Sequence, residues 1–155
     1  MANTNKTEAG NVVIRFTGDS GDGMQLTGTL FSNLSAILGN EISTFPDFPS
    51  EIRAPQGTLG GVSGFQVNLG ANKINTPGDD ADVMIAMNPA ALKVNAKGIK
   101  KNGVLIIDND SFAKSDLENA GFTTDNPLEE LKLSETIQII PAPLTTLTIA
   151  SLEGM

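Results

Sequence analysis

Short apolar runs recur along this chain, and segments with a helical pattern separate them. The runs lie at 12–16, 42–45, 83–87, 104–107 and 136–140. A continuous apolar run of this length is typical of a strand that is buried on both faces of a parallel sheet. Strands that alternate with helices predict an α/β protein with three layers, α/β/α, in which helices cover both faces of the sheet. We therefore expect a mostly parallel, Rossmann-like sheet with the runs at 12–16, 83–87 and 104–107 in its core.

One stretch departs from this pattern. From 51 to 70 the chain is rich in glycine, and it ends in an alternation of apolar and polar residues at 65–69. Alternation is typical of a half-exposed strand, so we expect an antiparallel strand near 62–69. Two other strands are expected to end at pairs of prolines, because Pro46 and Pro49 follow the run at 42–45, and Pro141 and Pro143 follow the run at 136–140.

The first helix is expected soon after the first strand, and Gly39 is a natural stop for it. Six apolar residues of this segment lie on one helical face, and they are Met24, Leu30, Phe31, Leu34, Ile37 and Leu38. Shorter helices are expected after Asn88, around 113–119 and around 128–133. We expect a flexible tail at 1–10 and a single domain over 11–155. A further element begins at 144–149 and stops soon afterwards, so we expect that the domain is truncated at its C-terminus.

The composition excludes several functions. The net charge is −8 and the chain has no basic patch, so nucleic acid and anionic membranes are poor partners. The chain contains no Cys and no His. This rules out disulfides, thiolate or imidazole metal ligation, an iron–sulfur cluster held by this chain, and Ser-His or Cys-His catalysis. No apolar run approaches the roughly 18 residues of a membrane helix, and we expect a cytoplasmic protein.

A glycine-rich turn between the first strand and the first helix is the main candidate site. It consists of Gly18, Asp19, Ser20, Gly21, Asp22 and Gly23. Glycines at such a turn let a phosphate approach the backbone N–H groups of a helix N-terminus. Ser20 replaces the second glycine of the dinucleotide fingerprint, and two carboxylates oppose a diphosphate unless a cation intervenes or they point away. The alternative is that Asp22 caps the helix and Asp19 fixes the turn, with nothing bound.

Three further residues are candidates for contact with a partner or substrate. Arg53 lies in a proline-braced loop, where it pairs with Glu51 or Asp47, or else binds a carboxylate, a phosphate or a partner subunit. Apolar residues in this loop and the glycine-rich stretch after it predict a subunit interface. Asn88 follows a strand and is expected to cap a helix, although ligands also gather at such strand ends. The acidic stretch 108–110 is expected to form a turn rather than a metal site.

Several longer motifs resemble one known family over nearly the whole span 12–148. They read VVIRFTGDSGDGMQLTG, FPDFPSEIRAPQGTLGGVSGFQVNLG, DVMIAMNPAAL and PAPLTTLT. Together they resemble the N-terminal gamma domain of the alpha subunit of 2-oxoacid:ferredoxin (acceptor) oxidoreductases, most closely the 2-oxoglutarate type (2-oxoglutarate synthase). That family converts a 2-oxoacid, coenzyme A and oxidised ferredoxin into an acyl-CoA, carbon dioxide and reduced ferredoxin.

The resemblance implies a supporting part in that reaction. Thiamine diphosphate, Mg and the iron–sulfur cluster are expected on other domains or subunits, whereas the gamma domain is mainly structural and lies on the coenzyme A side of the site. Partners would be the rest of the alpha subunit, a beta subunit and, indirectly, ferredoxin, and the isolated chain would be inactive. Two alternatives remain, namely a stand-alone dinucleotide-binding module and an assembly domain without a ligand.

Overall fold

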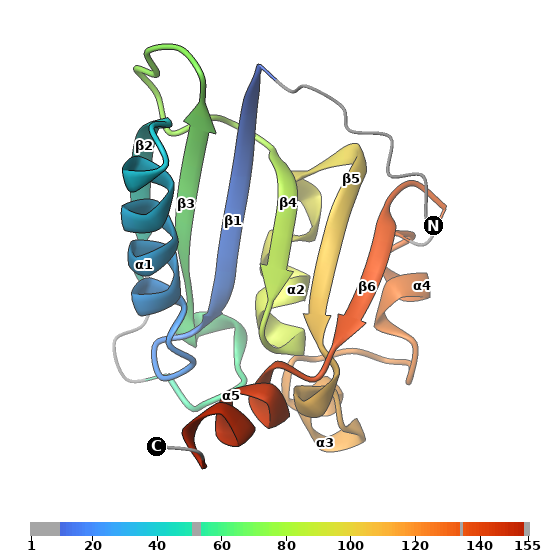
Figure 1. Cartoon of the computed structure of the whole chain (residues 1–155). Coiled ribbons are helices and arrows are strands. Elements are labelled where there is room, and N and C mark those ends of the chain that lie inside the picture. Colours follow the sequence, from blue (N-terminus) through green and yellow to red (C-terminus); the bar gives the residue numbers. More distant parts are fainter. Residues whose placement is uncertain (1–9, 51–53, 134, 154–155) are drawn as a thin grey trace, which may run out of the picture.

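The middle layer of the molecule is a six-stranded mixed sheet (Figure 1). The computed structural model describes residues 10–50, 54–133 and 135–153. Its strands are β1 (Asn11–Asp19), β2 (Glu41–Asp47), β3 (Val62–Gly70), β4 (Ala81–Ala86), β5 (Ile99–Asp108) and β6 (Gln138–Ala142), in the order β2-β3-β1-β4-β5-β6. β3 is antiparallel to both of its neighbours, and all other neighbouring pairs are parallel. The predicted fold, including its antiparallel strand, is confirmed.

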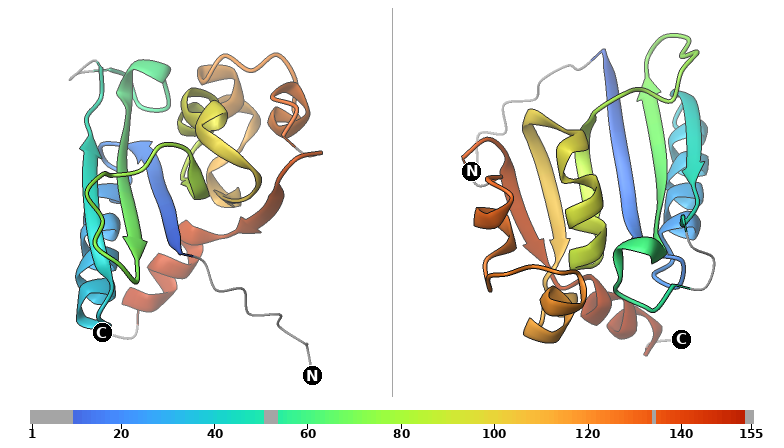
Figure 2. Two further views of the ribbon diagram at one scale, coloured as in Figure 1. Left: turned by 90° about the horizontal axis from the view of Figure 1, so that it is seen from above. Right: turned by 180° about the vertical axis from the view of Figure 1, so that it is seen from behind.

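Helices lie on both sides of this sheet, but they cover it unequally. They are α1 (Met24–Ile37), α2 (Pro89–Asn95), α3 (Lys114–Asn119), α4 (Pro127–Glu130) and α5 (Leu144–Leu152), with short 3-10 turns η1 (Leu59–Gly61), η2 (Ala96–Gly98) and η3 (Asn109–Ser111). α1 lies on one face, α2, α3 and α4 lie on the other, and α5 runs along the edge where the parallel strands end (Figure 2). Among the described residues, no helix is both long enough and apolar enough to span a membrane.

β3 is buried on both faces, so the expectation of a half-exposed strand is wrong. Gln66 is 6% exposed and Asn68 is 4% exposed. The Gln66 Nε2 donates to the carbonyls of Pro77 and Gly78 at 2.9 and 2.7 Å, and the Asn68 Nδ2 donates to that of Thr76 at 2.9 Å. The loop after β3 therefore folds back over the polar side of the strand, where hydrogen bonds compensate for the burial of these amides.

α1 forms where it was expected, but most of its predicted apolar face points away from the sheet. Of the six predicted residues, only Met24 is buried, while Phe31 is half-buried against Phe16. The helix instead contacts the sheet through small residues, because a Cβ added at Gly28 would lie 2.3 Å from the Phe65 Cδ1. The exposed side chains are Leu26, Leu30, Leu34, Ile37 and Leu38, with exposed fractions between 57% and 81%.

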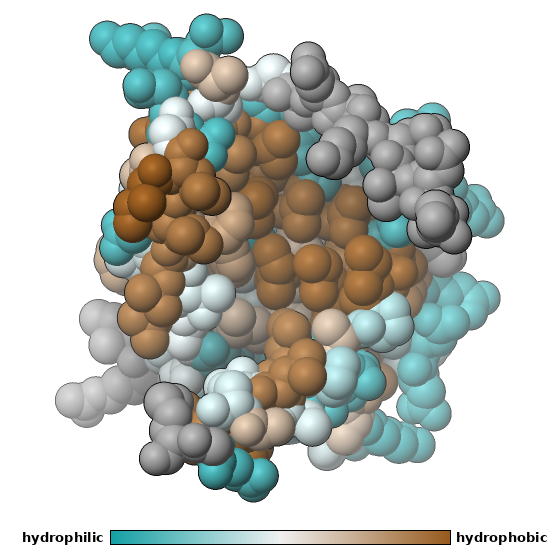
Figure 3. All heavy atoms as spheres, viewed as in Figure 1, coloured by the Kyte–Doolittle hydropathy of each residue, from teal (hydrophilic) through white to brown (hydrophobic). Residues whose placement is uncertain are grey.

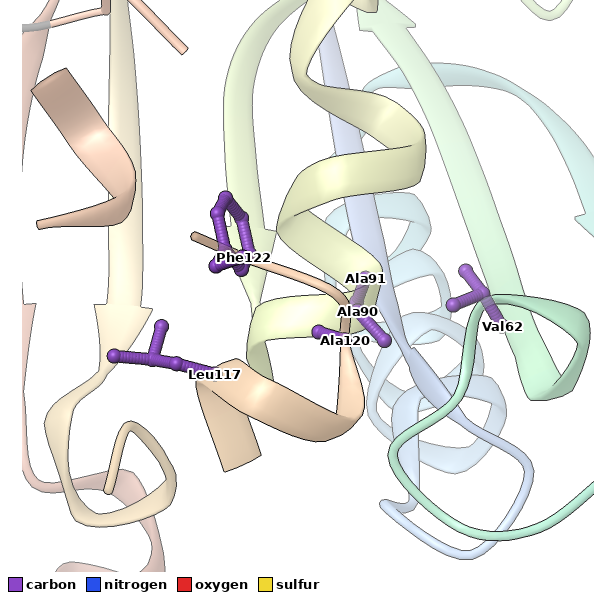
Figure 4. Close-up of a cluster of buried hydrophobic side chains, with 6 residues drawn as sticks. All are labelled: Val62, Ala90, Ala91, Leu117, Ala120 and Phe122. Atoms are coloured by element: carbon purple, nitrogen blue, oxygen red, sulfur yellow. The ribbon is translucent and has the colours of Figure 1, made fainter. Parts of the chain in front are cut away.

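The opposite face of the sheet has a well-covered core. Met84, Leu92 and Leu105 are fully buried beneath α2 and the segment around α4. A second cluster joins α2, α3 and the start of β3 (Figure 4), and its members are Val62, Ala90, Ala91, Leu117, Ala120 and Phe122. Alanines at this contact let the two short helices approach closely. This packing fixes the start of α2, which lies at the carboxyl ends of β1 and β4.

Both edge strands contain a proline. Pro46 pairs with Phe65 inside β2, and Pro141 pairs with Ile107 inside β6. Each strand thus extends one residue past the first proline of its predicted pair and ends before the second, Pro49 or Pro143. A proline is tolerated at the edge of a sheet, because its missing N–H interrupts no second ladder there.

Candidate functional site

The glycine-rich turn lies at the carboxyl edge of the parallel strands, beside the ends of β4 and β5 (Figure 1). β1 continues through Gly18 and Asp19, so the turn proper covers only residues 20–23. Asn88 follows β4 and contacts this turn directly. The structure therefore brings together the six turn residues and Asn88. Glu51 and Arg53, the other two candidates, lie outside the described residues.

Asp22 closes the turn on itself. Its Oδ2 accepts hydrogen bonds from the Asp19 backbone N–H and from the Asn88 Nδ2, both at 2.8 Å. Burial raises the pKa of the Asp22 carboxyl above its ordinary value, and the negative charges of Asp19 and Asp108 raise it further, although the two hydrogen bonds act in the opposite direction. The Asn88 Oδ1 accepts from the Ala91 N–H at 2.8 Å, which confirms Asn88 as the cap of α2.

Because Asp22 is occupied in this way, the interpretation of Asp22 as the cap of α1 is wrong. The N-cap is Gly23, which has a φ of 76° and no side chain to accept a hydrogen bond. Two neighbouring helix N-termini at this edge donate hydrogen bonds from their backbone N–H groups to side chains. Asn88 caps α2, and Asp108 accepts from the Leu144 N–H of α5 at 2.9 Å. The first turn of α1 thus has no side-chain cap for its backbone N–H groups, which lie at the positive end of the helix dipole.

Asp19 holds a neighbouring loop rather than its own turn. Its side chain is 5% exposed, and its Oδ2 accepts from the Gly57 N–H at 2.5 Å. Among the described residues, its buried Oδ1 has no hydrogen-bond donor. An unsatisfied buried acceptor costs about 1–3 kcal/mol.

Three hollows meet at the turn, and the smallest, of about 260 Å³, lies between the turn and the segment that contains Ala54, Gln56 and Gly61. The two others are larger. One of about 390 Å³ lies between the turn, Gln56, Asn88 and η3, and it is lined by the carboxylates of Asp19, Asp22, Asp110 and Asp116. The other, of about 440 Å³, lies between α1 and α5 and is less polar. In the part of the chain that the structure describes, no basic side chain lines either hollow. Both hollows therefore suit an uncharged or hydrogen-donating group better than a bare phosphate.

The inside of the turn is filled by the protein itself. A Cβ added at Gly18 would lie 2.8 Å from the Asp22 Oδ2 and 3.1 Å from the Met87 Cβ. In the dinucleotide fingerprint the first glycine allows the tight turn, and the second, at the position of Ser20, makes room for the pyrophosphate. In this chain Gly18 makes room for Asp22, which counts against a stand-alone dinucleotide-binding module.

Asp108 has a role that the sequence pattern did not reveal. The turn expected at 108–110 is confirmed as η3. The Asp108 carboxylate, only 3% exposed, accepts from the hydroxyls of Ser111 at 3.1 Å and Thr145 at 2.7 Å. It thereby ties α5 to the end of β5. The signal in the sequence was an aspartate directly after the apolar run at 104–107. Its partner 37 residues later cannot be inferred from local spacing.

Comparisons with known proteins agree on one family. A family model described as pyruvate ferredoxin/flavodoxin oxidoreductase matches residues 13–153. The 2-oxoglutarate oxidoreductase subunit KorA of Mycobacterium tuberculosis is 49% identical over 145 residues, which are 94% of this chain and 22% of that protein. The chain therefore spans about a fifth of the length of this curated relative.

Two solved structures share the fold. The 2-oxoglutarate:ferredoxin oxidoreductase of Magnetococcus marinus, with 2-oxoglutarate, coenzyme A and succinyl-CoA bound, superposes with a TM-score of 0.68 at 26% identity over 90% of this chain and 21% of that chain. The gamma subunit of a keto/oxoacid ferredoxin oxidoreductase from Geobacter sulfurreducens has a TM-score of 0.59 at 20% identity, over 87% of this chain and 62% of that chain.

Proposed function

This chain belongs to the pyruvate ferredoxin/flavodoxin oxidoreductase family, and we propose that it is the gamma-type domain of a 2-oxoglutarate:ferredoxin oxidoreductase alpha subunit. The observation that carries the proposal is the 49% identity with KorA over 94% of the chain. The structural likeness to an oxidoreductase that holds 2-oxoglutarate and coenzyme A supports it. A cytoplasmic location goes with it, because coenzyme A and ferredoxin are soluble intracellular molecules.

The proposed reaction is the oxidative decarboxylation of a 2-oxoacid to its acyl-CoA, with transfer of the electrons to ferredoxin. The residues of this chain do not fit the groups that perform the chemistry. The chain has no thiolate for an iron–sulfur cluster, and its described residues contain no cluster of carboxylates suited to a metal ion. Thiamine diphosphate, Mg and the cluster would therefore belong to the rest of the alpha subunit and to a beta subunit.

The contribution of this domain would be to bind coenzyme A at the glycine-rich edge. The uncapped N-terminus of α1 offers backbone N–H groups, and the buried Asp19 Oδ1 offers an acceptor. The carboxylates that line the polar hollow repel phosphates. These groups suit the pantetheine arm, whose two amides both donate and accept hydrogen bonds, better than they suit the nucleotide diphosphate. The phosphates of coenzyme A would then lie outside this domain.

Ligand titration of the isolated chain tests this part of the proposal. We expect pantetheine and coenzyme A to shift the amide resonances of Gly21, Gly23 and Met24 to a similar extent, whereas adenosine 3′,5′-diphosphate leaves them unchanged. Asp19→Asn is a matched variant, because it keeps the shape of the side chain but replaces one acceptor oxygen with a donor amide. Shifts caused by the nucleotide and not by pantetheine would contradict the assignment.

Activity tests the family role separately. The isolated chain should reduce neither ferredoxin nor a viologen dye when 2-oxoglutarate, coenzyme A and thiamine diphosphate are supplied. A hybrid alpha subunit, in which this chain replaces its counterpart in the Mycobacterium tuberculosis relative, should restore turnover together with a beta subunit. Robust dye reduction by the isolated chain, with contaminating enzyme excluded, would refute the proposal. The same conclusion would follow from an inactive hybrid that is folded and assembled.

A further inference from the structure

Apolar side chains form continuous rows across one face of the sheet. Residues paired across neighbouring strands share a face, so the register defines these rows. One row is Phe65, Phe16, Ile85, Ile106 and Ile140, and the next is Val67, Ile14, Val83, Val104 and Gln138. Neither row contains a charged residue. Both begin on β3, beneath α1, and both end on β6.

Exposure increases along these rows. Phe65 and Phe16, beside α1, are 8% and 6% exposed, whereas Ile85 and Ile106 are half-buried and Ile140 is 38% exposed. On the reverse face, Met84 is fully buried. Within 10–50, 54–133 and 135–153, no helix covers the first face over β4, β5 and β6 (Figures 1 and 2). Parallel strands are normally covered on both faces, so this side of the sheet has the composition of a core without its second layer.

We call this surface the bare face, and define it by Ile14, Val83, Ile85, Val104, Ile106 and Ile140. Figure 3 shows it as a hydrophobic area beside α1, whose own exposed leucines are also hydrophobic. Three of these leucines, Leu26, Leu30 and Leu34, recur every four residues and so form a stripe along the helix. The bare face and the leucine stripe of α1 are therefore two adjoining apolar surfaces.

The size of the bare face matches a single helix. The four strands from β1 to β6 are separated by three spacings of about 4.8 Å, which gives a width of about 14 Å. An α-helix with its side chains is about 10 Å wide. One helix beside α1 would therefore contact the isoleucines and valines of the bare face below it and the leucine stripe of α1 at its side. This arrangement would complete the third layer of the fold.

We propose that the bare face is the docking site for one amphipathic helix that belongs to the part of the longer subunit that this chain does not span. The chain covers 22% of the KorA relative and 62% of the single-chain Geobacter sulfurreducens gamma subunit, which has the same fold. Such relatives have ample further chain to supply the helix. A helix in the same polypeptide also has a high effective concentration at the site, which a second copy of the chain lacks. The inference rests on family membership and is independent of coenzyme A binding.

Cysteine labelling tests the occupant directly, because the chain contains no Cys of its own. Ile106→Cys places a thiol in the centre of the bare face, and Ile140→Cys is a second variant at its exposed border. Val94→Cys is the matched control, because Val94 is a 50% exposed apolar residue on α2, on the opposite side of the sheet. The labelling rate with a maleimide is measured by mass spectrometry of the modified peptide, in the isolated chain and in the hybrid alpha subunit.

We expect the thiols at 106 and 140 to react about tenfold or more slowly in the hybrid than in the isolated chain, since reaction then requires local opening. The control thiol should change by less than about twofold over the same comparison. If the hybrid does not fold, cysteines at the aligned positions of the intact Mycobacterium tuberculosis subunit provide the same measurement, with a denatured sample as the reference for full reactivity.

Two results would overturn the proposal. Equal labelling at 106 in the isolated chain and in the longer subunit would mean that no helix covers the bare face. Slower labelling of the isolated chain as its concentration rises, together with a dimeric mass, would assign the bare face to a second copy. A monomeric chain that binds an apolar dye such as anilinonaphthalene sulfonate, and loses this binding with Ile106→Lys but not with Val94→Lys, would support the open face that the proposal requires.

Discussion

Replacing Gly28 with alanine tests how closely α1 packs on the sheet. In an exposed helix this substitution stabilises by about 1 kcal/mol, because glycine loses more backbone entropy on folding. Here the added Cβ would lie 2.3, 2.7 and 3.0 Å from the Phe65 Cδ1, Cγ and Cβ. The Cβ and Cγ are the first atoms of a side chain that is 8% exposed, so the ring has little freedom to move away.

Overpacking of this kind costs about 1–3 kcal/mol, and the severity of the contact places Gly28→Ala at the upper end. After subtraction of the helix propensity gain, we expect the variant to be less stable by about 2 kcal/mol. The assay is urea unfolding followed by far-ultraviolet circular dichroism, because the chain has no Trp or Tyr for fluorescence. Asn33→Ala, at an exposed position of the same helix, is the control and should gain a few tenths of a kcal/mol.

A double-mutant cycle with Phe65→Ala isolates the contact. That background lacks the Cγ and Cδ1 that lie closest to the new methyl group, and Gly28→Ala should become close to neutral. If Gly28→Ala stabilises the wild-type chain as much as the exposed control does, α1 stands further from β3 than the structure indicates. The explanation for its outward-facing leucines would then fail.

Five further substitutions probe the turn. Gly23→Ala should destabilise by about 1 kcal/mol, because Gly23 has a positive φ, whereas Gly21→Ala should leave the melting temperature unchanged, since Gly21 has open space around it and no positive φ. For Asp22, the folded pKa is raised above the ordinary value of 3.8, so the folded chain binds more protons between the two pKa values. The stability of the wild type relative to Asp22→Asn should therefore fall as the pH rises through this window. If the urea midpoint of the wild type instead rises relative to that of Asp22→Asn over this pH range, the expected direction is wrong. Asp19→Ala should speed amide exchange at Gly57, because that N–H loses its acceptor, while Asp19→Asn, which keeps one oxygen, should speed it less.

The sequence was a good guide to the strands and a poorer guide to exposure. The runs at 83–87 and 104–107 predict β4 and β5 correctly, because continuous apolar runs are typical of parallel strands. The leucines of α1 have the spacing of a core face and point outward, because spacing defines a stripe but not what covers it. Gln66 and Asn68 alternate as solvent-facing residues would, yet they are buried because a later loop supplies their acceptors.

The candidate site could be located from the sequence, but its internal contacts could not. The glycine-rich turn and Asn88 were singled out because both follow strands, and the structure brings them within hydrogen-bonding distance. The two aspartates of the turn have functions that local spacing did not indicate. Asp19 accepts from Gly57, 38 residues away, and Asp22 accepts from Asn88, 66 residues away. Such tertiary partners cannot be inferred from a six-residue motif.

The prolines in the two edge strands limit the ways in which this domain can aggregate. An edge strand with free N–H and C=O groups is a template for adding strands from other molecules, and this is the route to cross-β fibrils. Pro46 in β2 and Pro141 in β6 each remove a donor and interrupt that template. When the domain is produced alone, its apolar surface lies on the sheet face instead of along an edge. Precipitates of the domain should therefore be amorphous, dissolve in mild denaturant and fail to bind thioflavin T.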